Sequence, residues 1–552
     1  MKDLEKVARN GYEPLVRINE NDSVFHVGSG SRDLTVDFEA LFKNLPATII
    51  DKQTLSLIQL RDLHEAVDHT TSKVGSATLF RSLMQPPTSL GLILAKQNSV
   101  RELESDDKLR NAVVDYLGEF QIGEMALFKF LNGQIHEKRP YGDFRKAMNG
   151  GSSIARAAKS IPLPYTGYLK FLLSEIDNFE QSAGYKLMRG PIYRTFGGLK
   201  SKEDISFFTP CWRFKPANFT LENLIGILTV GGLMGSAVWL KEGGDFFLAS
   251  LLGGKVSMLA AVFHGLGIKP PADYTKVIKP LRKKIIRDEQ FICSVESIGK
   301  LDELMSFIAY RKSMPHPTTL PEVTDAGIHY FIADNLRNPI EAKENKNYVP
   351  NSVNLNGARL TFITGPNSGG KTTYCKSILQ NQLLGQIGGY VVASEAKMNL
   401  TDRMAYQAPQ FDALQEEEGR FGTELKRTRD IFYSTTPRSL IVLDELAEGT
   451  TVEEKMQLSR VVLDGFHTIG SNTILVTHNH ALVDYFKEDG KGQYLQVEFS
   501  DEKPTHRLID GISKESHADR VAERIGFSGE AINRHLKEQG YLRKRQSYEE
   551  SH

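Results

Sequence analysis

The sequence is poor in cysteine and has no excess of either charge. Its 552 residues include three cysteines, Cys211, Cys293 and Cys375, which are far apart and form no CxxC pair. That spacing excludes a disulfide framework and a structural zinc site, and it is typical of a reducing compartment. Lys plus Arg and Asp plus Glu both total 68. Any surface that binds nucleic acid must therefore be a local patch.

The N-terminus lacks the apolar stretch of a secretory signal. It reads MKDLEKVARNGYEPL, with charges throughout, and a cytoplasmic protein is expected. Residues 1–45 mix Gly, Ser, Asn and charged residues and predict a loose N-terminal arm. A chain of 552 residues also exceeds what one hydrophobic core organises, so we expect two to four domains.

Residues 46–325 show mainly helical periodicity, and they predict a helical domain. Within it, 224–240 has 17 residues without a charge, and 246–268 has 23 with a single lysine, Lys255. Two interpretations of 224–268 fit: a pair of membrane-spanning helices or a buried helical hairpin. Each stretch approaches the ~20 residues that a bilayer requires. A lysine in the middle of the second stretch would be costly in lipid.

From 326 to 530 the pattern changes to short apolar runs separated by helical segments. Continuous apolar strands that alternate with helices predict a parallel sheet covered on both faces. The expected strands are 360–364, 390–392, 439–443 and 472–477. The last residues, 531–552, are charged and predict a C-terminal helix with a frayed tail.

A glycine-rich segment at 365–373, GPNSGGKTT, satisfies GxxxxGK[ST] and lies between an expected strand and an expected helix. In such a loop the backbone N–H groups surround the phosphates of a nucleotide and the lysine adds a fixed positive charge. The threonine hydroxyl that follows can coordinate Mg²⁺. The candidate ATP-binding residues are Gly365, Pro366, Asn367, Ser368, Gly369, Gly370, Lys371, Thr372 and Thr373.

Two acidic residues, Asp444 and Glu445, follow the apolar run SLIVL. Asp444 is placed to approach the Mg²⁺ together with Thr372, and Glu445 can orient or deprotonate an attacking water. A carboxylate at the second position favours hydrolysis over transfer to another acceptor. His478 ends the next strand, where its side chain could sense the γ-phosphate; a histidine by itself is more often structural.

Together these motifs resemble the MutS family of mismatch-repair ATPases. TGPNSGGKTTY, QIGGYVVASEA, LIVLDELAEGT and LVTHNHAL follow the order and spacing of that family's conserved blocks. Upstream, Arg337-Asn338-Pro339 and the YVPN of 348–351 resemble the elements that open its ATPase domain. Downstream, 509–527 resembles the segment after the ATPase core. A weaker similarity to the family's core and lever region begins at LHEAVDHTT.

The resemblance implies an α/β ABC-type P-loop ATPase domain preceded by a mainly α-helical core and lever domain. It further implies ATP and Mg²⁺ as cofactors, catalytic Glu445, a switch histidine at His478, and Mg²⁺ held by Thr372 and Asp444. It also implies a homodimer, in which the partner's signature loop completes each nucleotide site, and DNA as the bound partner in mismatch repair or recombination.

Two departures from the family pattern change these expectations. The family reads mismatches through an N-terminal domain with a Phe-x-Glu wedge, but only about 45 residues precede the lever region, and Phe38-Glu39 lacks the intervening residue. Mismatch reading by that wedge is not expected. Second, Gly419, Arg420 and Gly422 stand where the family has a serine-containing signature. Either Arg420 acts on the partner's γ-phosphate, as arginines do in other NTPases, or it is a solvated loop residue.

Two functional hypotheses follow. The first is a MutS-like ATPase that couples ATP binding and hydrolysis in a dimer to DNA binding, with the basic runs 426–429 and 543–545 as candidate backbone contacts. The second is a membrane-attached MutS-like ATPase, anchored through 224–268, whose partner is not DNA. A transporter ATPase would need an LSGGQ-type signature, and none is found.

Overall fold

The chain divides into two compact units. Unit 1 comprises Met1–Asp325 and Gln382–Val391, and unit 2 comprises Ala326–Asn381 and Val392–His552. The computed structural model describes residues 25–27, 34–36, 49–217, 262, 267–366, 369–409, 419–446, 451–500, 503–513, 525–539 and 541.

Unit 1 is mainly helical over its described residues. Its helices are α3 (Lys52–Leu57), α4 (Leu60–Val67), α5 (Lys73–Met84), α6 (Leu90–Ser105), α7 (Asp107–Leu131), α8 (Tyr141–Ala158), α9 (Gly167–Asn178), α10 (Ala183–Arg189), α13 (Lys269–Asp273), α14 (Lys279–Ile286) and α15 (Glu289–Ser313), with a 3-10 turn at Phe179–Gln181 and a π-helical turn at Tyr274–Ile278.

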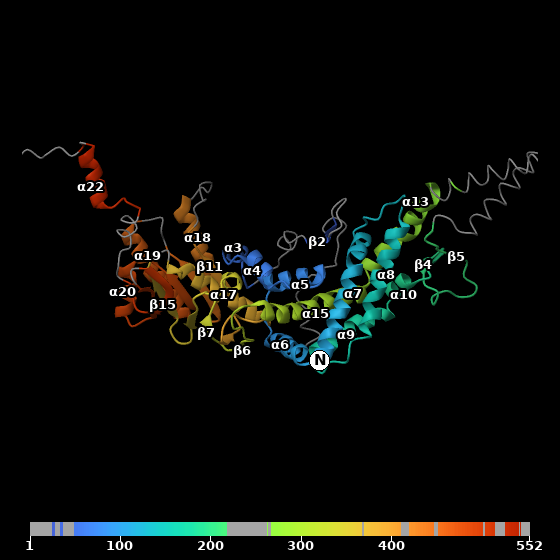
Figure 1. Cartoon of the computed structure of the whole chain (residues 1–552), viewed down its shortest axis with the longest axis horizontal. Coiled ribbons are helices and arrows are strands. Elements are labelled where there is room, and N and C mark those ends of the chain that lie inside the picture. Colours follow the sequence, from blue (N-terminus) through green and yellow to red (C-terminus); the bar gives the residue numbers. More distant parts are fainter. Residues whose placement is uncertain are drawn as a thin grey trace, which may run out of the picture. The chain divides into compact units, whose positions relative to one another are not determined.

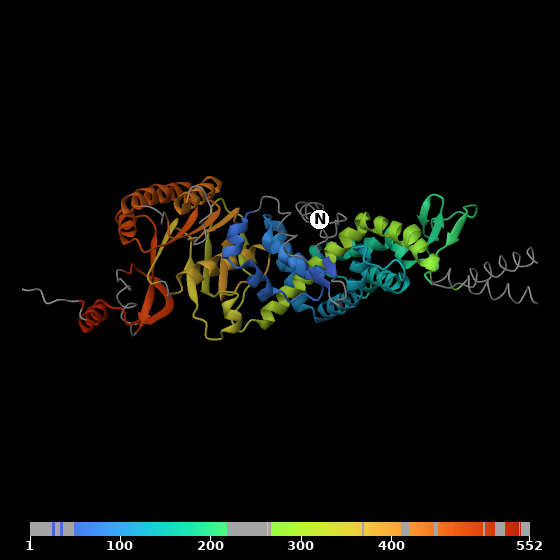
Figure 2. The ribbon, with the colours of Figure 1, turned by 90° about the horizontal axis from the view of Figure 1, so that it is seen from above.

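The long helix α15 is the centre of unit 1. Asp288 caps its N-terminus by accepting the N–H groups of Gln290 and Phe291, and its apolar side chains recur every three or four residues and are buried along its length. It packs against α5, α6 and α9, and Figures 1 and 2 show it in yellow-green against the blue and cyan helices of this unit.

Two buried carboxylates hold the start of α5. Asp302 of α15 accepts the backbone N–H groups of Thr71 and Ser72 at 2.9 and 2.7 Å. Glu124 of α7 accepts those of Lys73 and Val74 at 3.0 and 2.8 Å. Burial raises the pKa of Asp302 to about 6 and that of Glu124 to about 7, because a low-dielectric site disfavours the charged form.

The strands of unit 1 are short. They are β1 (Phe25–Val27), β2 (Leu34–Val36), β3 (Tyr193–Thr195), β4 (Gly198–Lys200), β5 (Cys211–Arg213) and β6 (Glu322–Thr324). Within the predicted arm, β1 and β2 form an antiparallel pair. β3 pairs antiparallel with both β4 and β5.

The apolar segment 224–268 lies outside the described residues, apart from Val262 and residues 267–268. Among the helices that are described, none combines the length and the apolar character that crossing a bilayer requires.

Unit 2 contains most of the sheet structure. Its strands are β7 (Phe331–Leu336), β8 (Asn351–Asn354), β9 (Leu360–Thr364), β10 (Glu395–Asn399), β11 (Arg403–Gln407), β12 (Ser439–Asp444), β13 (Asn472–Val476), β14 (Gln493–Ser500) and β15 (Lys503–Asp510). Its helices are α16 (Glu341–Glu344), α18 (Gly419–Ser434), α19 (Val452–Ile469), α20 (His480–Glu488) and α22 (Gly529–Glu538), while α17 (Lys371–Gln386) begins in unit 2 and its last residues are grouped with unit 1.

The main sheet has the order β11-β12-β13-β9-β14-β15. Its first five strands run parallel and β15 is antiparallel to β14. The parallel sheet expected from the apolar runs is thus confirmed, since an α/β sheet covered by helices needs strands that are apolar on both faces. The strand expected over 390–392 is wrong, because Val391 makes only an isolated bridge with Thr319.

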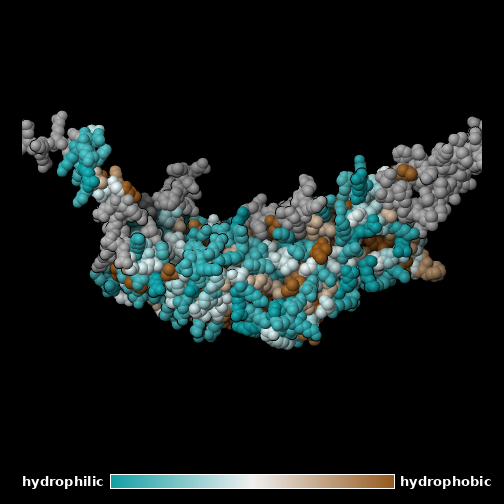
Figure 3. All heavy atoms as spheres, viewed as in Figure 1, coloured by the Kyte–Doolittle hydropathy of each residue, from teal (hydrophilic) through white to brown (hydrophobic). Residues whose placement is uncertain are grey.

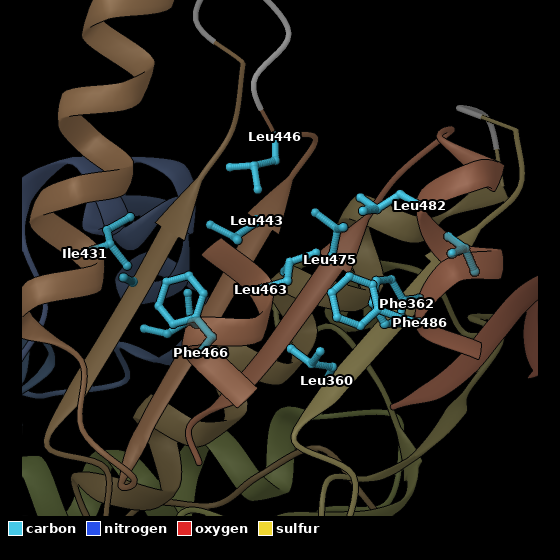
Figure 4. Close-up of a cluster of buried hydrophobic side chains, with 13 residues drawn as sticks. Leu360, Phe362, Ile431, Leu443, Leu446, Leu463, Phe466, Leu475, Leu482 and Phe486 are labelled. Atoms are coloured by element: carbon cyan, nitrogen blue, oxygen red, sulfur yellow. The ribbon is translucent and has the colours of Figure 1, made fainter. Parts of the chain in front are cut away.

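One face of this sheet carries the hydrophobic core drawn in Figure 4. Alternate residues of the strands point to it, because side chains of a strand alternate between faces. Helices α18, α19 and α20 and Leu446, just after β12, add the rest. The core comprises Leu360, Phe362, Ala405, Ile431, Ile441, Leu443, Leu446, Leu463, Phe466, Leu475, Leu482, Val483 and Phe486. This packing fixes the carboxyl ends of β9, β12 and β13.

Candidate nucleotide site

The glycine-rich loop connects the end of β9 to the start of α17. Gly365 and Gly370 have φ of +126° and +87°, a region that favours glycine. A Cβ on Gly369 would lie 2.5 Å from Cγ2 of Val497 on β14. The loop therefore packs closely on the neighbouring strand, and its glycines are required by conformation and by space. The candidate residues Asn367 and Ser368 lie outside the described residues.

The Lys371 side chain binds back to the first residues of its own loop. Its Nζ donates to the carbonyl oxygens of Gly365 at 2.5 Å and of Pro366 at 2.9 Å, and only 3% of the residue is exposed. Burial lowers the pKa of Lys371, while the nearby carboxylates Asp444 and Glu445 oppose that shift. An anion in the loop would favour the charged lysine and compete with the two carbonyl groups.

Asp444 lies beside Thr372 at the carboxyl end of β12. The Thr372 hydroxyl donates to Asp444 Oδ2 at 3.1 Å, and the Tyr406 hydroxyl of β11 contacts the same oxygen at 3.4 Å. Burial raises the pKa of Asp444, and the Thr372 hydrogen bond opposes this. A hydroxyl and a carboxylate oxygen side by side are the hard ligands that Mg²⁺ prefers, so the pair fits that ion.

Glu445 is held by several donors. Its φ of +61° is unusual for a residue with a side chain, and its N–H donates to Val476 of β13 at 2.9 Å. Its carboxylate accepts the Thr477 hydroxyl at 3.0 Å and the His478 N–H at 2.8 Å. Lys455 of α19 forms an ion pair with it at 3.5 Å. Thr477 and Lys455 are further members of the site that the sequence motifs do not predict.

His478 follows β13 and is joined to the acidic pair through its backbone. Partial burial and then the positive charge of Lys371 lower the pKa of its side chain, although Glu445 opposes the shift. These effects favour a neutral imidazole, which can donate at one nitrogen and accept at the other.

A cavity of about 430 Å³ adjoins the loop. Gly370, Thr372 and Thr373 line one side of it, and Tyr348, Asn351 and His506 are among the residues that line the remainder. The Asn351 amide donates to the carbonyl of His506 at 3.0 Å and accepts the N–H of Leu508 at 2.7 Å. These bonds fix His506, whose φ is +62°, beside Gly370.

The cavity residues show what sequence reasoning missed. Tyr348 and Asn351 lie in the YVPN element that was already recognised, but His506 lies in β15, far along the chain and without a motif of its own. Only the pairing of β15 with β14, next to β9, brings it to the loop.

The first turn of α18 contains the trans-signature candidates Gly419, Arg420 and Gly422. Phe421, which lies between Arg420 and Gly422 in the sequence, packs on the core. Two residues of the basic run 426–429, in the same helix, contact other residues of unit 2. Arg427 donates to the Tyr406 carbonyl at 3.4 Å and Arg429 pairs with Asp430 at 2.8 Å. The other basic run, 543–545, lies outside the described residues.

The mainly parallel sheet has a glycine-rich loop after its central strand β9 and acidic residues at the end of β12, an arrangement typical of an α/β domain that binds a ligand at the carboxyl ends of its strands. Comparison with known families agrees. Residues 361–542 match the family model described as MutS domain V. This C-terminal region of the chain is thus similar to domain V of MutS proteins.

Curated relatives match less than half of the chain. The DNA mismatch repair protein MutS of Shouchella clausii is 30% identical over 273 residues, which cover 47% of this chain and 30% of that protein. The DNA mismatch repair protein msh3 of Aspergillus niger is 31% identical over 265 residues, covering 44% and 23%. The msh3 protein of Emericella nidulans is 33% identical over 243 residues, covering 41% and 22%. The matches thus span less than a third of each relative's length.

Proposed function

We propose that this protein is an ABC-type P-loop ATPase that binds and hydrolyses ATP with Mg²⁺ in a dimer and couples this cycle to DNA binding. The observation that carries the proposal is the convergence of Lys371, Thr372, Asp444 and Glu445 at the carboxyl ends of β9 and β12. The helical region 46–325 would serve as core and lever, 326–530 as the ATPase domain and 531–552 as a C-terminal helix and tail.

Each residue would have a distinct task in hydrolysis. The loop N–H groups and Lys371 bind the phosphates, with Lys371 exchanging its two carbonyl partners for phosphate oxygens. Thr372 and Asp444 would hold Mg²⁺, which neutralises charge on the phosphates when bound. Glu445 accepts a proton from the attacking water, and its hydrogen bonds to Thr477 and His478 set the direction of its carboxylate.

The cavity beside Gly370 is proposed to hold the base and ribose of the nucleotide. Its volume of about 430 Å³ suits a small-molecule ligand. His506 and Tyr348 offer flat rings for stacking on a base, and the backbone geometry that Asn351 imposes keeps His506 next to the phosphate loop.

The dimer would complete each site with residues from the other subunit. Gly419, Arg420 and Gly422 begin α18, and an arginine near a transferring phosphate can stabilise its negative charge. Replacing Arg420 by Ala should lower turnover that depends on dimer formation and leave ATP affinity unchanged. Turnover equal to that of the native chain at dimer-forming concentrations would refute a role for Arg420 in trans.

DNA is the proposed partner because the relatives that match are named DNA mismatch repair proteins. Fluorescence anisotropy with homoduplex, mismatched and four-way DNA, at several salt concentrations and with or without ATP, would test it. Phosphate contacts predict an affinity that falls steeply with salt. A comparison of the mismatched with the matched duplex shows whether binding depends on a mismatch. Failure to bind any of them at low salt would defeat the DNA assignment.

Hydrolysis is tested with two substitutions and two matched controls. Lys371→Ala should abolish nucleotide binding, while Glu445→Gln should keep binding and lose turnover. Lys487→Ala and Glu488→Gln, at exposed positions of α20, remove the same charges elsewhere in unit 2 and should leave both quantities unchanged. If Lys371→Ala binds ATP as the native chain does, the loop is not the nucleotide site.

A further inference from the structure

The small sheet β4-β3-β5 of unit 1 exposes a group of large aromatic side chains. This aromatic rim consists of Phe196, Phe207, Phe208 and Trp212, which are 85%, 96%, 88% and 59% exposed. On the face drawn in Figure 3, the described surface is mostly hydrophilic. An aromatic side chain buries about 150–250 Å² when it is covered, so four in one short segment mark an interaction surface.

The four rings gather in two pairs. Phe196, in the turn after β3, meets Trp212 of β5 edge to face, with ring centroids 5.8 Å apart. Phe207 meets Phe208 in the same way at 5.4 Å. Trp212 lies directly opposite Arg194 in the β3–β5 register, so a cation shares its face of the sheet.

The surroundings of the aromatic rim are basic. Residues 189–217 contain six Lys or Arg side chains and two acidic ones. Both acidic groups already have partners, because Glu203 pairs with Lys186 at 3.1 Å and Asp204 accepts the Ser201 hydroxyl at 2.6 Å. With six basic side chains against two acidic ones, the net charge of residues 189–217 is positive and complements an anionic partner.

We propose that the aromatic rim contacts the headgroup region of a lipid bilayer that contains anionic lipid. Trp and neighbouring Lys or Arg side chains are enriched at the membrane interface, where a ring enters the apolar boundary and a cation meets the headgroups. Phe side chains, three of the four here, have no polar group to satisfy in that boundary. The sequence that follows supports lipid as the partner, because 224–240 carries no charge over 17 residues.

A single-stranded nucleic acid is the alternative partner for a basic aromatic surface. Base stacking requires an accessible ring face, and in each edge-to-face pair the edge of one ring covers part of the other ring's face. Lipid contact has no such requirement. This inference does not depend on ATP or on the nucleotide site, so either proposal can fail without the other.

Trp212 provides the test, since the chain has only two tryptophans and the other is Trp239. In the full chain with Trp239→Phe, emission reports Trp212 alone. Vesicles of phosphatidylcholine with phosphatidylglycerol should shift that emission to shorter wavelength, and lipids brominated near the headgroup should quench it more than lipids brominated at the chain ends. Unchanged emission and no quenching would overturn the proposal. So would a shift caused only by a single-stranded oligonucleotide.

A flotation assay supplies a second readout. Phe207→Ser with Phe208→Ser should weaken partitioning onto the anionic vesicles by roughly tenfold or more, since each exposed ring contributes apolar area. Both rings are more than four-fifths exposed, so the fold should survive, and circular dichroism checks this. Tyr433→Ser, at an 81% exposed aromatic of α18, is the matched control. Equal flotation of all three proteins, with Trp212 unquenched, would place membrane attachment elsewhere and refute the role of the rim.

Discussion

Thr477 should be required to orient Glu445, and Thr477→Val removes its hydroxyl at nearly constant volume. That hydroxyl donates to Glu445 Oε2 at 3.0 Å and is buried. A hydrogen bond to a charged group contributes about 1.5–3 kcal/mol. Glu445 keeps the His478 N–H and Lys455 as partners, so we expect the lower end of that range. A barrier about 1.4 kcal/mol higher corresponds to a roughly tenfold lower kcat.

The assay is steady-state ATP hydrolysis with kcat and KM measured separately. Thr477→Val should lower kcat with KM nearly unchanged, because the hydroxyl contacts the carboxylate and not the loop. Thr477→Ser keeps the hydroxyl and should restore most of the rate. The hydroxyl also accepts the N–H of Asn479 at 3.1 Å, so thermal unfolding of both variants controls for stability. A kcat for Thr477→Val equal to that of the native chain would refute the orienting role.

Three further outcomes are expected. Asp444→Asn removes the carboxylate beside Thr372, so the Mg²⁺ concentration that supports half-maximal hydrolysis should rise at least tenfold, roughly the loss of one charge-assisted contact; an unchanged Mg²⁺ titration would contradict the metal assignment. His506→Ala should weaken the binding of ATP and leave the binding of inorganic triphosphate unchanged, as measured by calorimetry. An equal loss of affinity for both ligands would contradict the proposal that this cavity binds the base. Burial raises the pKa of Glu124 from 4.5 to about 7, so its contribution to stability is complete below pH 4.5 and is lost as the pH rises to 7, by about 3 kcal/mol. Glu124→Gln should remove this pH dependence, so the difference in denaturation midpoint between the native chain and the variant should change from pH 4.5 to 8. A constant difference over that range would refute the prediction.

Local sequence patterns were sufficient for the main strands of unit 2. β9, β12 and β13 are apolar on both faces, and their expected ranges agree with the observed bounds within one residue. The spacing GxxxxGK[ST] likewise located the loop, because few residues other than glycine adopt the positive φ that its first and last glycines have. The apolar run 390–392 failed as a strand since burial alone does not distinguish a strand from a buried loop.

Contacts between distant segments could not be predicted from the sequence. Asp302 binds the backbone at Thr71 and Ser72, about 230 residues away in the chain. In the candidate site, Lys455 and His506 come from α19 and β15 and carry no motif of their own. Their positions follow from the order of strands in the sheet, which depends on tertiary packing rather than on local propensity.

The most direct test of the central claim is ATP hydrolysis by the Glu445→Gln chain, compared with the native chain at saturating Mg²⁺ and ATP. Glutamine keeps the size of the side chain and cannot accept the proton of the attacking water. Loss of a general base typically costs about 10²–10⁴-fold in rate, so turnover should fall at least a hundredfold while ATP affinity is preserved. Turnover within a few-fold of the native rate, with ATP still bound, would contradict the assignment of this site as the ATPase centre.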